Sequence, residues 1–221
     1  MNSFKAILAG MSIGLFSLPA LSSENNFYFS VGGGNGNPAE VSAGETDDDD
    51  IELDADFDDS FIYDIEVGKK IENWRLGLSY TNGEHEFDEF TVSSKSLGIG
   101  LTGTFIGEKP VVDFNTLMFN VYRDFPTENK FSPYIGIGIG QSNVEFQDYS
   151  VTIDGTTFVV TDEGRDLFTW DIKGGVSYEV NNTTDLYGEL SYMQTEEWDE
   201  DGIDYDGIGR TNLTAGIRFN F

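Results

Sequence analysis

Apolar residues alternate with polar or small residues through most of this 221-residue chain, and this alternation restricts the fold more than any other feature. Between Leu213 and Phe221 every second residue is apolar, and Thr214, Gly216 and Arg218 stand among them. A period of two is that of a β-strand, whose successive side chains point to opposite faces, whereas a helix repeats every 3.6 residues. The sequence therefore predicts an all-β chain.

Eight segments share this alternation. They lie at residues 27–31, 61–67, 74–80, 116–122, 135–140, 168–179, 186–193 and 212–221. The links between them are alternately long (34–59, 81–110, 142–165 and 195–209) and short (69–73, 125–132 and 181–184). Alternating long and short links are typical of an up-and-down barrel in a membrane, with short turns on the periplasmic side and long loops outside. We therefore expect an eight-stranded antiparallel transmembrane β-barrel, or ten strands if residues 91–104 form an extra pair.

The bulk of the side chains on each face predicts which face meets lipid. Glycine recurs on the less apolar face, at Gly77, Gly136, Gly138, Gly140, Gly175 and Gly216. The interior of an eight-stranded barrel is only just wide enough for side chains, so small residues suit that face. Aromatic residues at or near strand ends suit the two membrane interfaces, and they include Trp74, Tyr80, Trp170, Tyr178, Tyr192 and Phe221. A soluble, lipocalin-like binding barrel is the alternative, and it would bury the apolar face instead.

The N-terminus predicts export. Lys5 precedes an apolar stretch at residues 6–18, and Ala20 and Ser22 supply small residues for a signal peptidase. We expect residues 1–22 to be a secretory signal peptide and residues 23–221 to form the barrel. The apolar stretch is shorter than the roughly 20 residues of a membrane-spanning helix, and no later segment is longer.

Two stretches resemble a known family. Residues 120–125, Asn-Val-Tyr-Arg-Asp-Phe, precede a short turn and the run Ser-Pro-Tyr-Ile-Gly-Ile-Gly-Ile-Gly at residues 132–140, and the chain ends on Phe221. This is similar to the small bacterial outer-membrane β-barrels, which include outer membrane protein A-type barrels, opacity adhesins and rickettsial surface antigens. Arg123 departs from the aromatic residue common at that position. The resemblance implies a location in the bacterial outer membrane among lipid and lipopolysaccharide. It also implies recognition of Phe219 and Phe221 by the barrel assembly machinery.

Charged residues on the predicted inner face form the first candidate site. They are Asp64, Glu66, Arg75, Asp171, Lys173, Glu179, Glu189 and Arg218. Buried charges are tolerated when they are paired and hydrogen-bonded, so we expect a salt-bridged plug that closes the lumen. A narrow, gated path for ions or small solutes is the alternative.

Acidic loops form the second candidate site. Residues 45–59 hold ten carboxylates, and Asp54, Asp56 and Asp58 have the spacing of a calcium-binding loop. The sixth position is Asp59 rather than glycine, and the twelfth is Ile65 rather than a bidentate carboxylate. A second loop carries Asp199, Asp201 and Asp204. The main expectation is a solvated, self-repelling surface, and weak binding of Ca²⁺ or Mg²⁺ is the alternative.

Several functional classes are disfavoured by composition. A formal net charge of −28 with only 12 Lys and Arg argues against nucleic acid as a partner. The chain has no cysteine and a single histidine, His85, so thiol and histidine chemistry have little to build on. We expect no catalytic residues and no resident cofactor. The main functional hypothesis is a structural or surface-interaction role, adhesin-like or antigen-like, in which the acidic loops meet an extracellular protein.

Overall fold

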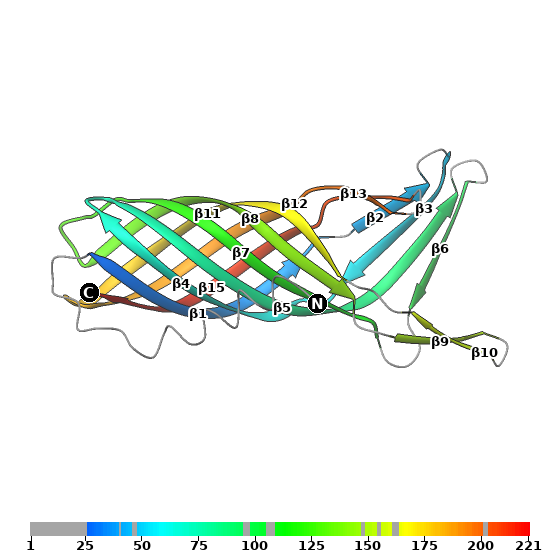
Figure 1. Ribbon diagram of the computed structural model, residues 1–221, viewed down its shortest axis with the longest axis horizontal. Coiled ribbons are helices and arrows are strands. Elements are labelled where there is room, and N and C mark those ends of the chain that lie inside the picture. Colours follow the sequence, from blue (N-terminus) through cyan, green and yellow to red (C-terminus); the bar gives the residue numbers. More distant parts are fainter. Residues whose placement is uncertain are drawn as a thin grey trace.

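A closed barrel of eight antiparallel strands forms the body of the molecule (Figure 1). The computed structural model describes residues 26–39, 41–45, 48–94, 98–104, 109–146, 149–153, 156–160, 164–200 and 203–221. The barrel strands are β1 (Phe27–Pro38), β4 (Ser60–Ile71), β5 (Trp74–Ser94), β7 (Val111–Asp124), β8 (Phe131–Phe146), β11 (Arg165–Asn181), β12 (Thr184–Thr195) and β15 (Gly209–Asn220). The last strand pairs with the first, with Phe29 opposite Phe219, and this pairing closes the barrel. The predicted eight-stranded architecture is confirmed.

Residues 1–22, the expected signal peptide, lie outside the described residues. Within the part of the chain that the structure describes, no helix has the length and apolar character needed to cross a membrane.

The three short links are tight turns, as predicted. Residues 72–73 join β4 to β5, residues 125–130 join β7 to β8, and residues 182–183 join β11 to β12. Glu72 has a φ of 54°, in the left-handed region that a tight turn requires and that few side chains adopt.

The long links contain more strand than a loop prediction implies. β2 (Val41–Glu45), β3 (Asp48–Phe57), β6 (Ile99–Thr104), β13 (Trp198–Glu200) and β14 (Ile203–Tyr205) extend the sheet beyond the barrel, in the order β13-β14-β2-β3-β5, and β6 also pairs with β5. We call this group the outer sheet (Figure 1). β9 (Tyr149–Ile153) and β10 (Thr156–Val160) form a separate hairpin. The suggested extra pair at residues 91–104 exists as β5 and β6, but it belongs to the outer sheet, so the barrel keeps eight strands.

The apolar face of each strand points outward. On β8, Ile135, Ile137 and Ile139 are each more than half exposed, while Gly136 and Gly138 between them are buried. A Cβ added at Gly136 would lie 2.5 Å from Cδ1 of Tyr122, so the lumen has no room for a larger residue there. This arrangement confirms the inward glycines and excludes the soluble, inward-packed alternative.

Aromatic side chains mark two levels on the outer face. Trp74 and Tyr178 lie beside the short turns, and ring contact joins Trp170 to Tyr192 further along their strands. Tyr80 also faces outward, but its neighbours cover it and its hydroxyl donates to Asn115 Oδ1 at 2.6 Å. Tyr80 pairs with Ile65, and Tyr63 with Asn82. We therefore treat β5 as crossing the membrane between Trp74 and Asn82.

Apolar residues fill the inner face at the end of the barrel next to the outer sheet. Six of them form a buried cluster that we call the apolar cap: Val41, Val112, Phe114, Val144, Leu167 and Ile208. Phe57, Phe87 and Trp198 pack against it. The inner face thus changes from polar in the membrane to apolar above it.

Candidate functional site

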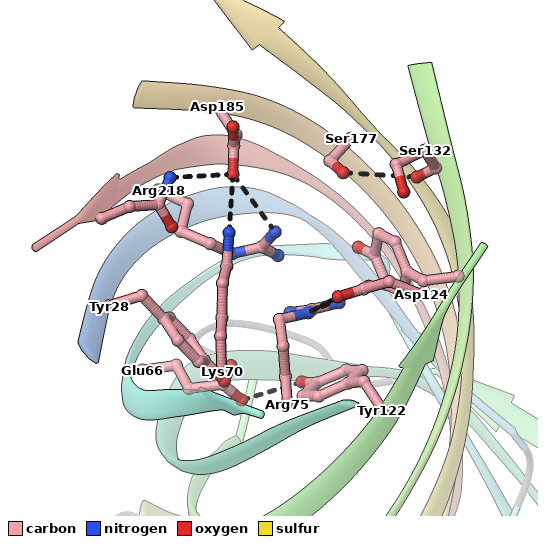
Figure 2. Close-up of polar contacts among 12 residues, drawn as sticks. Tyr28, Glu66, Lys70, Arg75, Tyr122, Asp124, Ser132, Ser177, Asp185 and Arg218 are labelled. Carbon is pink, nitrogen blue, oxygen red and sulfur yellow. Dashed lines mark hydrogen bonds and ion pairs between the residues drawn. The ribbon is translucent and has the colours of Figure 1, made fainter. Parts of the chain in front are cut away.

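Glu66 is the centre of a hydrogen-bonded group inside the barrel. Its carboxylate is only 4% exposed and accepts three bonds. Tyr28 donates its hydroxyl to Oε1 at 2.7 Å, and Tyr122 donates its hydroxyl to Oε2 at 2.8 Å (Figure 2). Asn120 donates its amide to Oε2 at 2.7 Å. These donors come from β1 and β7, and Glu66 is on β4, so the group ties together a wall segment of four consecutive strands, β1-β4-β5-β7. A buried carboxylate with three donors is fully compensated.

Arg75 lies next to this group and is fully buried. Its Nε donates to both carboxylate oxygens of Asp124, at 3.1 and 3.0 Å (Figure 2). The guanidinium carbon also lies 4.1 Å from the ring centroid of Tyr122 and 4.6 Å from that of Tyr134. An arginine between aromatic faces gains cation–π stabilisation in addition to its ion pair.

Asp185 forms a second ionic layer near the periplasmic end. Lys70 Nζ lies 3.3 Å and Arg218 Nη1 lies 3.8 Å from the same oxygen, Oδ2 of Asp185 (Figure 2). Asn220 donates its amide to that oxygen at 3.1 Å. Below this layer, a vestibule of about 240 Å³ opens towards the periplasmic turns.

Lys173 pairs with acidic residues in the middle of the lumen. Its Nζ lies 3.1 Å from Asp171 and 3.9 Å from Glu189. Tyr134 donates its hydroxyl to Glu189 at 3.0 Å. The cavity bordered by these residues has a volume of about 30 Å³, which holds one or two water molecules. The middle of the lumen is therefore a packed polar core.

The predicted lumen set is brought together with one exception. Asp64, Glu66, Arg75, Asp171, Lys173, Glu189 and Arg218 all lie inside the barrel. Glu179 keeps the predicted inward direction and borders the vestibule at the periplasmic end, but it is exposed there and lies outside the packed charge group. Glu179 continues the inward alternation of β11, but it lies just beyond Tyr178, which pairs with the first residue of β8, so little wall remains to cover it.

The prediction missed most of the partners of these charges. Tyr28, Tyr134 and Tyr187 point inward, as do the carboxylates of Asp124 and Asp185. Strand alternation carried the signal. Tyr134 and Tyr187 stand two positions from Gly136 and Glu189, which were predicted to face inward, whereas Tyr28 alternates with the apolar residues Phe27 and Phe29. Tyr122 also lies on the inner face and is buried.

The candidate metal residues do not converge. Asp54 accepts a hydrogen bond from Ser42 at 2.7 Å, and Asp58 pairs with Lys109 at 2.7 Å. Asp199 and Asp204 are opposite each other on β13 and β14, whereas Asp201 lies outside the described residues, and Asp56 forms no cluster. In the ranges that the structure describes, no group of three or more His, Asp or Glu side chains is arranged to hold a metal ion.

Phe219 and Phe221, the predicted assembly signal, lie on the outer face at the seam of the barrel. Both are 38% exposed, and the backbone amide of Phe221 donates to the carbonyl of Phe27 at 2.9 Å. Their accessibility on the closing strand is compatible with recognition, which stays a prediction.

Comparison with solved structures shows the same fold. Neisserial surface protein A superposes with a TM-score of 0.54 at 17% identity, over 89% of this chain and 97% of that chain. OprG from Pseudomonas aeruginosa superposes with a TM-score of 0.53 at 14% identity, over 89% and 97%. At these identities the likeness concerns the fold alone. The outer membrane protease OmpT from Escherichia coli is 10% identical over 93% and 99%, and its TM-score of 0.49 carries no argument about activity.

A search of proteins with curated functions gives no match. The family model described as the outer membrane protein beta-barrel domain matches residues 8–221. Because this match spans nearly the whole chain and the eight strands close into a barrel with an apolar outer face, the chain belongs to the outer membrane β-barrel domain family.

Proposed function

We propose that this protein is a closed outer-membrane barrel with a structural and surface-interaction role, and that the outer sheet carries out the recognition. The observation that supports this role most strongly is the apolar cap above a filled lumen. Phe114, Val112 and Val144 are fully buried, and below them the polar side chains bond to one another. A water-filled pore needs a continuous polar path, and a buried apolar layer opposes one by dewetting.

The chemistry of the outer sheet suggests its partner. Residues 45–59 hold ten carboxylates and include all of β3. A single-sign surface attracts oppositely charged partners and raises their association rate. An extracellular protein with a basic surface therefore fits best, and divalent cations beside lipopolysaccharide would bind the same carboxylates more weakly.

Cells that display the barrel provide the test of this role. We would measure their retention on beads that carry soluble proteins of graded isoelectric point. Retention should increase with the basicity of the bead protein and decrease with ionic strength. Asp54→Asn with Asp56→Asn should reduce retention several-fold.

The matched control removes two carboxylates from the other side of the membrane, through Glu72→Gln with Glu179→Gln. Both residues are exposed at the periplasmic end. The surface role would be contradicted if the two double variants were retained equally, or if retention did not depend on the charge of the bead protein.

The polar middle of the lumen makes a narrow channel the second candidate, because Lys173, Asp171 and Glu189 place charged groups inside the lumen. Planar-bilayer recording separates the two. We expect the wild-type protein to remain silent, and Arg75→Met and Arg218→Met to remain silent as well, since the apolar cap is intact in both. Discrete conductance steps in the wild-type protein would favour the channel.

Export and assembly complete the proposal. We expect mass spectrometry of the mature protein to find an N-terminus at or near residue 23. Phe221→Ala should lower the fraction of folded, heat-modifiable protein in outer membranes, because the assembly machinery would read the terminal strand. We assign no catalytic activity, because the single histidine, His85, is covered and bonded to the backbone carbonyl of Asp58.

A further inference from the structure

Arg210 on β15 is fully buried just below the apolar cap. Its guanidinium carbon lies 5.3 Å from the ring centroid of Phe114, and Nη2 lies 4.0 Å from Sδ of Met193. Nε and Nη1 have no hydrogen-bond partner among the described residues, and no ion pair joins Arg210 to a carboxylate there. Arg75 and Arg218, by contrast, each have an acidic partner.

An arginine keeps its proton in a protein, so this charge cannot be relieved by deprotonation. A buried charge without a partner is strongly unfavourable, and native proteins compensate it with an opposite charge. Arg210 therefore needs a counter-charge that its own neighbours do not supply.

The acidic residues deeper in the lumen are engaged by other groups. Glu66 accepts its three bonds from Tyr28, Tyr122 and Asn120. Asp171 and Glu189 pair with Lys173, and Asp64 accepts the hydroxyl of Tyr187 at 3.3 and 3.4 Å. None of them reaches the guanidinium of Arg210.

His85 on β5 faces the same space as Arg210. Its Nδ1 lies 3.2 Å from the carbonyl oxygen of Asp58, which can only accept, so Nδ1 carries a proton and donates. Nε2 is buried and has no partner in the described part of the chain. A Cβ added to Gly83 would lie 3.3 Å from Nε2 of His85 and 3.5 Å from Nη1 of Arg210. Both nitrogens therefore face the same small space beside Gly83.

The surroundings limit the size of an occupant. The position of that added Cβ is one bond length from Cα of Gly83 and 2.6 Å from Cγ2 of Ile62, so an occupant must sit at van der Waals distance from both, on the side of the two nitrogens. Arg210 and Ile62 border one end of the lumen cavity that also reaches Lys173, and the whole of that cavity has a volume of only about 30 Å³. This volume suits one monatomic ion and excludes phosphate or a carboxylate metabolite.

We propose that Arg210 and His85 form a binding site for a single monatomic anion, chloride under ordinary conditions, beneath the apolar cap. Nε and Nη1 of Arg210 donate to the anion. His85 becomes a second donor when Nε2 takes up a proton, so anion binding and protonation of His85 strengthen each other. The site is independent of the proposed surface role.

The charged groups around His85 are consistent with this coupling. Arg210 faces it from β15, and Asp59, whose carboxylate accepts the amides of Asn35 and Asn37, contributes a weaker opposite effect. Phe114 on β7 contacts the His85 ring edge-on and carries no charge. His85 lies beyond the membrane-spanning part of β5, and burial, followed by the Arg210 guanidinium, lowers its pKa to about 4. A bound anion would oppose Arg210 and raise that pKa.

The experiment compares unfolding of the refolded barrel in sodium chloride and in sodium gluconate of equal ionic strength, at pH 7.5 and pH 5. At ten times the dissociation constant, chloride should lower the unfolding equilibrium constant about tenfold, and the effect should be larger at pH 5. Arg210→Met should abolish the difference between the two salts. Arg123→Met, which removes an arginine stacked on Trp74 at 5.0 Å outside the lumen, should preserve it.

A bromide soak of crystals keeps the proposal testable if Arg210→Met fails to fold. An anomalous peak between Arg210 and His85 would support the site. Absence of that peak, or a chloride effect that is equal in wild type and Arg210→Met, would overturn it and leave water as the occupant.

Discussion

Glu66→Gln tests the central group of the lumen with the smallest change in shape. The amide keeps the volume of the side chain but replaces one acceptor oxygen with a donor. Tyr28 donates to one oxygen of Glu66, while Tyr122 and Asn120 donate to the other, so in either orientation the new NH₂ group faces at least one donor. A buried hydrogen-bonding group that loses its partner costs about 1–3 kcal/mol. We expect Glu66→Gln to lower the free energy of unfolding by about 2 kcal/mol.

Equilibrium unfolding in urea, followed by tryptophan fluorescence of the barrel in lipid vesicles, measures this loss. Glu179→Gln is the matched control, because Glu179 is exposed, and it should change the free energy by less than about 0.5 kcal/mol. In a Tyr28→Phe background, Glu66→Gln should cost less, since the new NH₂ group can then replace the oxygen that has lost its only donor. A loss below about 0.5 kcal/mol for Glu66→Gln, or full additivity with Tyr28→Phe, would refute the reasoning.

Three further predictions concern packing and pH. Gly138→Ala should reduce the refolded fraction sharply because an added Cβ would overlap Oδ1 of Asn120, whereas Gly174→Ala, with open space around it, should refold normally in the same gel-shift assay. Phe114→Ala should lower the free energy of unfolding by about 3–5 kcal/mol, measured in urea, because it leaves a void in the apolar cap. In chloride-free buffer, lowering the pH from 6.5 to 4 should destabilise the barrel by roughly 3 kcal/mol: the unfolded chain protonates His85 near pH 6.5, but the folded chain does so only near 4. His85→Gln should flatten that pH dependence, and an unchanged slope in urea titrations would contradict the assignment.

The barrel was predictable because two constraints act on the same residues. Lipid requires bulky apolar residues on the outer face, and a narrow lumen requires small or bonded residues on the inner one. Residues 135–140 satisfy both, with isoleucine and glycine in strict alternation. A shift of one residue would expose glycine to lipid and force isoleucine into the lumen, so these positions fix the register.

The apolar cap was not predicted because alternation gives the direction of a side chain and not its height. Val112 and Phe114 occupy the same inner face as Met118 and Tyr122, but they lie beyond the membrane, where apolar residues must be buried inward. Glu179 keeps its inward direction, but for the same reason its exposure was not predicted, because the wall is short at the other end. The position of a residue along the axis depends on the pairing of neighbouring strands, which is a long-range property.

The partners of the lumen charges were only partly predictable. Strand alternation predicts that Tyr28 and Asp124 point inward. The local sequence does not predict that Tyr28 contacts Glu66, 38 positions away, or that Arg75 contacts Asp124. Arg210 was not identified at all, because an inward arginine looks the same in sequence whether or not it has a carboxylate partner.

β5 belongs to two environments at once. It runs unbroken from Trp74 to Ser94, and the 12 residues after Asn82 reach roughly 40 Å along the strand at about 3.3 Å per residue. The outer sheet is therefore anchored to the wall by covalent backbone rather than by a hinge, and a pull on it is transmitted directly to the hydrogen bonds between β4 and β5. Amide hydrogen exchange should consequently slow steadily along β5 from Ser94 towards Trp74, and the tip should fray long before the base opens.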